Sequence, residues 1–122
     1  MKLLSAILLF LSFVAVTCAQ RDEKSIRAAG LISLEVFPGR PNFESIKDGD
    51  EPEKAWILTV ARPEKPERFH LVVLDGQEQK FAILRKSVGR KVVVEGSVWE
   101  ACSPHHHTAF LITVKTIKEE PN

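Results

Sequence analysis

Apolar and polar residues alternate along much of this chain, which is typical of half-buried β-strands. Within the segment 30–36, Ile32, Leu34 and Val36 are separated by single polar residues. A period of two places all three on one face of a strand. Similar patterns predict four further strands, at 55–60, 69–74, 91–99 and 109–117.

Glycine and proline residues separate these strands and indicate the fold. Asp75-Gly76 is a typical hairpin turn. Residues 79–84 either extend the ladder or begin a short helix. Gly96 lies inside the fourth strand, where glycine indicates a bend or bulge of the kind that barrel corners require. The sequence therefore predicts an all-β protein, a small five-stranded OB-like barrel with little helix; a small open sandwich is the alternative.

The first 19 residues have the features of a signal peptide. Lys2 precedes an apolar run at 3–16, and small residues follow at 17–19, so we expect cleavage after Ala19. A lipid anchor at Cys18 is the alternative, which the residues before that cysteine disfavour. The expected location is outside the cytoplasm, in the periplasm or extracellular space of a bacterium. The predicted organisation is a signal peptide at 1–19, a flexible leader at 20–29, the barrel at 30–118 and a tail at 119–122.

Charge and motif content exclude several functions. The chain has 17 Lys plus Arg and 16 Asp plus Glu, and loss of Lys2 with the signal peptide makes the counts equal. Non-specific binding of nucleic acid needs an excess of basic charge, so we expect no nucleic-acid partner. No second apolar stretch approaches the ~20 residues of a spanning helix, so we expect no transmembrane segment. Neither a triad nor a nucleophile elbow is present, and we expect no enzymatic activity.

A run of histidines is the sharpest chemical signal. His105, His106 and His107 lie close after Cys102, in the segment that joins the last two strands. Imidazole and thiolate are good ligands for zinc or copper. Because neighbouring side chains of an extended segment point in opposite directions, His105 and His107 can converge while His106 faces away. The candidate metal ligands are therefore His105, His107 and Cys102.

An acidic connection at 37–54 is the second candidate element. In OB barrels the loop after the first strand and the loop between the fourth and fifth both border the ligand face. The predicted fold therefore brings the acidic connection near the histidines. The candidate ligand-binding residues are Asn42, Glu44, Asp48, Asp50, Glu53, His105, His106, His107 and Thr108. Three interpretations remain open: histidine–carboxylate contacts that lock the two loops, a metal site, or a site for a small molecule or peptide.

The cysteines add one expectation. If Cys18 leaves with the signal peptide, Cys102 stands alone and cannot form an internal disulfide. It is then a buried thiol, a link to another chain, or a soft metal ligand.

Three blocks of sequence stand out together. They are Phe-Pro-Gly-Arg-Pro-Asn-Phe-Glu-Ser-Ile-Lys-Asp-Gly-Asp-Glu-Pro-Glu at 37–53, Val-Gly-Arg-Lys-Val-Val-Val-Glu-Gly at 88–96, and His-His-His-Thr at 105–108. With them the chain resembles an uncharacterised bacterial family, a domain of unknown function found in exported proteins, from about residue 30 to 114. The resemblance implies an exported OB-like domain and no particular activity. Ala109 stands where the family commonly has proline, and residues 61–63 lack a cysteine that many members carry, so no family disulfide is carried over.

Two functions follow as expectations. The first is a non-enzymatic binding or interaction module of the cell envelope, whose partner is a protein, peptide or envelope ligand. The alternative is a zinc- or copper-binding protein that uses the His105–His107 loop together with the acidic residues 48–53.

Overall fold

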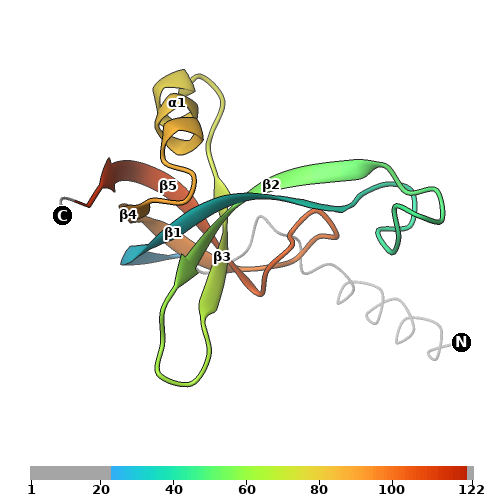
Figure 1. The fold of residues 1–122 in the computed structure, drawn as a ribbon, viewed down its shortest axis with the longest axis horizontal. Coiled ribbons are helices and arrows are strands. Elements are labelled where there is room, and N and C mark those ends of the chain that lie inside the picture. Colours follow the sequence, from blue (N-terminus) through green and yellow to red (C-terminus); the bar gives the residue numbers. More distant parts are fainter. Residues whose placement is uncertain (1–22, 121–122) are drawn as a thin grey trace, which may run out of the picture.

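The computed structural model describes residues 23–120, so the expectations for the signal peptide and Cys18 lie outside the described residues. Within these residues, five strands and one helix make up the fold. Figure 1 shows their arrangement. They are β1 (Lys24–Pro38), β2 (Pro52–Val60), β3 (Glu67–Val72), α1 (Glu78–Lys86), β4 (Lys91–Glu100) and β5 (Phe110–Glu119). Within 23–120, no helix is long and apolar enough to cross a membrane.

The five strands close into a barrel in the order β1-β2-β3-β5-β4. Strands β3 and β5 run parallel, and all other neighbours are antiparallel. This order, with one helix between β3 and β4, is that of an OB barrel. The predicted all-β fold is confirmed, and residues 79–84 belong to α1 rather than to the ladder.

The long strand β1 closes the barrel because it serves two neighbours. Its first half, Lys24–Leu31, pairs with β4, and its second half, Leu31–Pro38, pairs with β2. The predicted flexible leader at 20–29 is therefore wrong from Lys24 onward. Ala28 and Gly30 are buried there but carry little or no side chain, so the apolar pattern was weak. Gly30 is needed, since a Cβ there would lie 2.3 Å from the carbonyl oxygen of Thr59.

Other boundaries differ from the prediction by a few residues. Strand β2 begins at Pro52, and β5 continues to Glu119, so the first residue of the predicted tail at 119–122 belongs to the sheet. Proline is tolerated at Pro52 because it is the first residue of the strand.

The core fills the barrel interior and is closed by α1. Leu84 of α1 is fully buried, and Phe81 and Ile83 pack against the core from the same helix. The buried core residues are Ala28, Ile32, Leu58, Val60, Phe69, Leu71, Leu84, Val92, Val94, Ile112, Val114 and Ile117.

Gly96 marks the predicted irregularity of β4. The register between β4 and β5 shifts between Glu95 and Gly96, which confirms the bulge. A Cβ at Gly96 would lie 2.0 Å from the carbonyl oxygen of Thr113. The close approach of the two backbones therefore requires glycine at this corner of the barrel.

We expect Gly96→Ala to lower the free energy of unfolding by about 3 kcal/mol, because the clashing atom is backbone and cannot move aside cheaply. Urea unfolding followed by tryptophan fluorescence measures the change. Lys115→Ala, on an exposed position of β5, serves as the control and should alter stability by less than ~0.5 kcal/mol. Equal stability of the two variants would contradict the close packing of β4 on β5.

Candidate functional site

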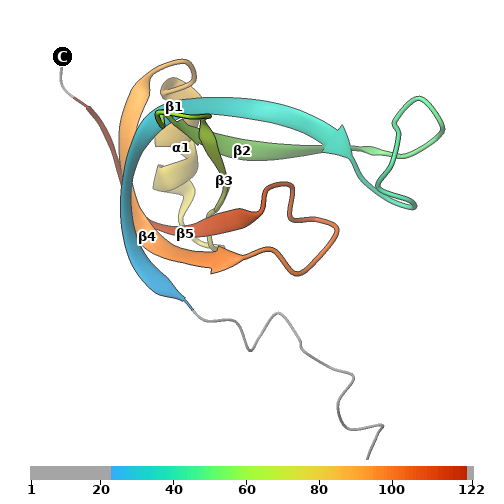
Figure 2. The ribbon, with the colours of Figure 1, turned by 90° about the horizontal axis from the view of Figure 1, so that it is seen from below.

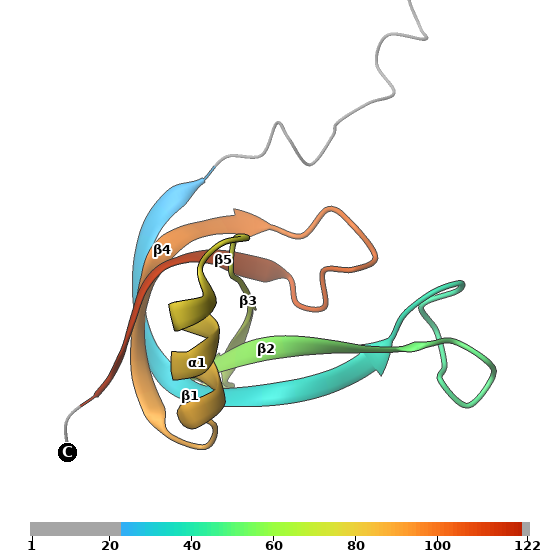
Figure 3. The same cartoon turned by 90° about the horizontal axis from the view of Figure 1, so that it is seen from above.

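Two loops leave the barrel on the same side, away from α1 (Figures 2 and 3). The β1–β2 loop spans residues 39–51, and the β4–β5 loop spans residues 101–109. These are the two loops that border the ligand face of OB barrels, so the predicted site elements are brought to one side of the molecule.

Asp50 organises the β1–β2 loop. Its buried carboxylate accepts hydrogen bonds from the backbone N–H groups of Asn42 (2.8 Å), Glu44 (2.8 Å) and Ser45 (2.9 Å). These bonds, with that from Ser45 the strongest, hold the pKa of Asp50 below its ordinary value. Asp50 was predicted as a ligand-binding residue, but both of its oxygens are already used within the loop.

Glu53 joins the two loops. One carboxylate oxygen lies 2.8 Å from Nδ1 of His105, and the other lies 2.6 Å from Nε2 of His107. The His107 side chain is only 7% exposed, whereas that of His105 is 48% exposed. Burial opposes ionisation of Glu53, but the hydrogen bonds from His107 and His105 outweigh it and lower the pKa of the carboxyl. We call this three-residue arrangement the histidine clamp.

Each imidazole of the run also packs on its own aromatic ring. The ring of His107 stacks on Phe37 with centroids 4.3 Å apart. His105 meets Phe43 edge to face at 4.9 Å. His106 turns the other way, meets Trp99 edge to face at 4.9 Å, and accepts the backbone N–H of Cys102 at Nδ1 (3.0 Å). The convergence of the first and third histidines, with the second facing away, follows the expected alternation.

His70, on β3, contacts His107 of the histidine clamp. Its Nδ1 accepts the backbone N–H of His107 at 3.4 Å, and the two rings stack with centroids 5.5 Å apart. Thr108 accepts the backbone N–H of His70 and donates to the carbonyl of Phe110. Burial, together with the nearby His107 and His106, lowers the pKa of His70 to about 4, so this imidazole is neutral near pH 7. Sequence analysis did not place His70 at the site, because its contacts depend on the pairing of β3 with β5.

The β4–β5 loop covers part of the outer face of the barrel. Ile57 pairs with His70, and His70 pairs with Leu111, so these side chains share a face opposite to the core. Ala55, Ile57, Trp99 and Leu111 are all buried, yet none belongs to the main core cluster. Since His106 rests on Trp99 and His107 on His70, the loop seals this second, smaller apolar layer. The strand face that OB barrels often present to a ligand is therefore occupied by the chain itself.

The other predicted site residues do not meet the histidines. Asp48 is exposed in the β1–β2 loop, and Asn42 and Glu44 give only their backbone N–H groups to Asp50. Among the acidic candidates, Glu53 alone reaches the β4–β5 loop through an observed hydrogen bond.

Cys102 is disulfide-bonded in the full chain. The expectation of a lone Cys102 concerns a chain that has lost Cys18, the other cysteine of the sequence, which lies outside the described residues, so it stays a prediction. A disulfide sulfur is not a thiolate ligand, so Cys102 is unsuited to the predicted metal site in this state. Across residues 23–120, no group of three His, Cys, Asp or Glu side chains has the arrangement of a metal site.

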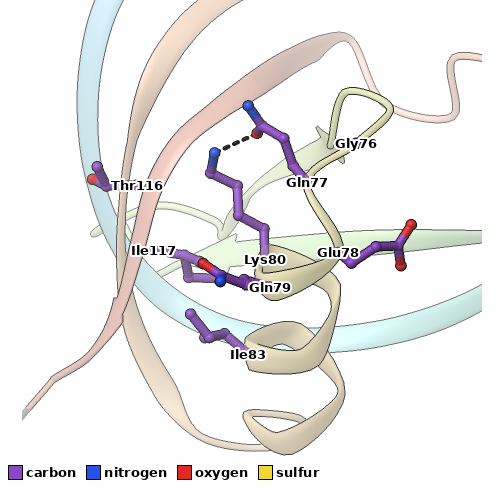
Figure 4. Close-up of a pocket in the computed structure, with 8 residues that line it drawn as sticks. All are labelled: Gly76, Gln77, Glu78, Gln79, Lys80, Ile83, Thr116 and Ile117. Atoms are coloured by element: carbon purple, nitrogen blue, oxygen red, sulfur yellow. Dashed lines mark hydrogen bonds between the residues drawn. The ribbon is translucent and has the colours of Figure 1, made fainter.

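A separate pocket of about 630 Å³ lies between α1 and the end of β5. Figure 4 shows Lys80 extended toward the side-chain oxygen of Gln77, with which it forms a hydrogen bond. The remaining lining is mostly uncharged and open, and it lies at the helical end of the barrel, away from the clamp. None of the residues predicted as site residues lines this pocket.

Comparison with known proteins adds a partial family match. A family model described as a domain of unknown function (DUF4431) matches residues 68–118. This span holds α1, β4, the β4–β5 loop and nearly all of β3 and β5, but the 37–53 block lies outside it. No curated protein and no solved structure matches the chain. The match supports the expected likeness to an uncharacterised domain family and brings no activity with it.

The clamp geometry predicts a structural role for the histidines. We expect Glu53→Ala to lower the free energy of unfolding by about 2 kcal/mol. The change removes two charge-assisted hydrogen bonds and leaves the buried Nε2 of His107 without its carboxylate partner. Glu51→Ala, which removes an exposed carboxylate from the same connection, is the control and should have little effect.

The same prediction extends to metal. Native mass spectrometry with zinc and copper should find both the wild type and the His105→Ala/His107→Ala variant free of metal, with the variant melting at a lower temperature. One metal ion per chain in the wild type, lost in the variant, would contradict structural locking and favour the metal-binding alternative.

The shifted pKa of His70 predicts a pH dependence of stability. The folded chain takes up this proton near pH 4 and the unfolded chain near 6.5, so the unfolded state binds more protons between these values. Stability should therefore fall as the pH is lowered from 6.5 to 4.5, by about 1–2 kcal/mol when the partial exposure of the ring is allowed for. Glu53 contributes only at lower pH, since its pKa lies below 4.5 in the folded state.

His70→Gln keeps a hydrogen-bond acceptor but cannot titrate, so its stability should fall much less than that of the wild type over this range. Urea unfolding at pH 6.5, 5.5 and 4.5 measures both slopes. A variant whose slope equals that of the wild type would show that another group causes the dependence.

Proposed function

We propose that this chain is a non-enzymatic binding module of the cell envelope, with the paired β1–β2 and β4–β5 loops as its ligand face. The observation that carries the proposal is the histidine clamp. A single carboxylate holds both loops in one arrangement, and such preorganisation lowers the entropy that a ligand must pay on binding.

The surface of the paired loops has the mixed character of a protein-binding face. Asn42 and Glu44 are exposed, as are Arg40 and Ile46 in the same loop, and Phe43 is half-buried beside His105 of the other loop. Polar groups around partly exposed aromatic and aliphatic side chains are typical of protein–protein contacts. We therefore favour a protein or peptide ligand over a small molecule.

The N-terminal sequence supports a function outside the cytoplasm. The apolar N-terminal run with small residues at 17–19 has the pattern of a signal peptide.

The proposal is tested with the full chain expressed with its own N-terminal stretch and recovered from the periplasm or culture fluid. The exported protein is immobilised as bait for envelope proteins, beside an Asn42→Ala/Glu44→Ala variant. Only backbone groups of these two residues hold the loop, so the variant should fold normally while its loop surface is changed. A Glu64→Ala/Lys65→Ala variant in the exposed β2–β3 loop is the control.

We expect at least one envelope component to bind the wild type and the control variant, and to bind the Asn42→Ala/Glu44→Ala variant at least ten-fold more weakly. Identical binding by all three baits would contradict the assignment of the ligand face to these loops. Retention of the whole chain in the cytoplasm would contradict the envelope location.

A further inference from the structure

Among the described residues, no strand covers one edge of the second half of β1. Strand β4 pairs with β1 only as far as Leu31, and beyond this point β1 pairs with β2 alone. A short segment after α1 covers the next position, since Val88 forms an isolated bridge with Ile32. Within the described residues, the edge of β1 from 33 to 38 therefore carries no neighbouring strand. In Figures 2 and 3 this part of β1 extends past the rest of the barrel together with β2.

Hydrogen bonds at both ends of this stretch show which backbone groups face the open edge. The N–H and C=O of Ile32 face away from β2, toward Arg90 and Gly89, whereas the N–H of Gly39 bonds across to Glu51 beside β2. Because successive residues of a strand point their backbone groups to alternate edges, those of Leu34 and Val36 face the open edge. Two N–H donors and two C=O acceptors are thus presented in a row.

Exposed apolar side chains accompany these backbone groups. Leu34 is 42% exposed and Val36 is 52% exposed. Both continue the row of Ile32, which is buried in the core, and Leu34 lies opposite the half-buried Trp56 of β2. An exposed apolar strand edge is a template for another strand, and proteins normally protect such edges. Here Pro38 ends the edge after a few residues, which limits the length of any strand that pairs with it.

The occupant that fits best is a peptide rather than a second copy of this chain. Symmetric antiparallel pairing of two such edges would place Leu34 beside Val36 of the other copy and bring the two Glu35 carboxylates opposite each other. Like charges directly opposite destabilise a strand pair. The edge is also too short to bury the area of a stable dimer interface, which is about 1,200–2,000 Å².

Charge defines the chemistry of the peptide further. Lys54 lies opposite Val36 on β2, is exposed, and has no carboxylate within ion-pair distance in the described part of the chain. It therefore presents an uncompensated positive charge beside the apolar row. We infer that the free edge of β1 at Leu34–Val36 binds an extended partner segment that has apolar side chains at alternate positions and an acidic side chain near Lys54. Binding by strand addition gives affinity through main-chain hydrogen bonds and specificity through the alternate side chains.

This edge is distinct from the ligand face of the paired loops. Leu34 and Val36 point to the core side of β1, whereas Phe37, which contacts the histidine clamp, points to the opposite side. A negative result for ligand binding at the paired loops therefore does not bear on peptide binding at this edge. The Asn42→Ala/Glu44→Ala variant should bind the peptide as the wild type does.

The test uses a small library of acetylated, amidated heptapeptides of the form Thr-X-Thr-X-Thr-Glu-Thr, where X is Val, Ile, Leu or Phe. Binding to the full exported chain is followed by NMR, with amide hydrogen exchange read at each residue. We expect at least one peptide to bind and to slow exchange of the Leu34 and Val36 amides at least ten-fold at saturation. Two N-methylated forms of this peptide, each methylated at every second residue but in opposite registers, distinguish the two edges of the bound peptide. The form whose methyl groups replace the N–H donors that face β1 should lose the protection, because it can no longer donate hydrogen bonds to β1.

Three variants sharpen the test. Leu34→Thr/Val36→Thr keeps strand propensity but removes the apolar row and should weaken binding at least ten-fold. Lys54→Glu should weaken binding of the Glu peptides and favour peptides with Lys in its place. Leu74→Thr changes an equally exposed apolar residue elsewhere and should have no effect. No binding by any library member up to ~1 mM, or binding without protection of Leu34 and Val36, would overturn the inference.

Discussion

The hydrogen bonds of Glu53 with His105 and His107 determine how the two long loops of this barrel are placed. Loops of this length carry many backbone groups and few apolar side chains, so they have little reason to adopt one arrangement by themselves. One carboxylate at the start of β2 accepts from two imidazoles on the β4–β5 loop, and both contacts are made at once only when the loops are brought together. The position of the proposed ligand face depends on this interaction.

Each residue of the histidine run contributes to the same result through different chemistry. His105 and His107 add ring contacts with Phe43 and Phe37 to their bonds with Glu53. His106 fixes the start of its own loop through Cys102 and packs on Trp99. Together they seal an apolar layer on the outer face of the barrel, which stabilises the loop and leaves the loop tips as the surface that a ligand can reach. A cluster of histidines in sequence is here explained by packing and hydrogen bonding.

The barrel has two surfaces with the properties of binding sites, and the alternation along β1 separates them. Side chains at odd-numbered positions of β1, such as Phe37, face outward and support the histidine clamp. Side chains at even-numbered positions face the core at Ile32 and continue on the same face to the exposed Leu34 and Val36. Both surfaces exist because β1 and β2 extend beyond the closed part of the barrel. Extension of a strand pair past its neighbours creates a rigid arm with one protected face and one open edge.

Much of the fold was determined by the local sequence. The alternation in 91–99 and 109–117, the turn at Asp75-Gly76 and the glycine at position 96 each act over a few residues, so a single sequence predicts them. The OB-like topology then placed the acidic and histidine loops on one side. His105 and His107 converge as predicted, but through a turn closed by the bond from His106 N–H to the carbonyl of Ser103 and not through an extended chain. The early part of β1 was missed because its buried positions are Ala28 and Gly30, which carry too little apolar surface to form a pattern.

Only the tertiary structure decided which residues meet. Five acidic side chains between 44 and 53 are similar in sequence, but the pairing of Phe37 with Glu53 places that carboxylate alone under the β4–β5 loop. Asp50 is drawn inward by three backbone N–H groups, and His70 reaches the clamp only because β3 lies between β2 and β5. The sequence determined which segments become strands and which loops carry chemistry, because these depend on neighbouring residues. The partners of Glu53 and the open edge of β1 depend on strand register, which is set by contacts between residues far apart in the chain.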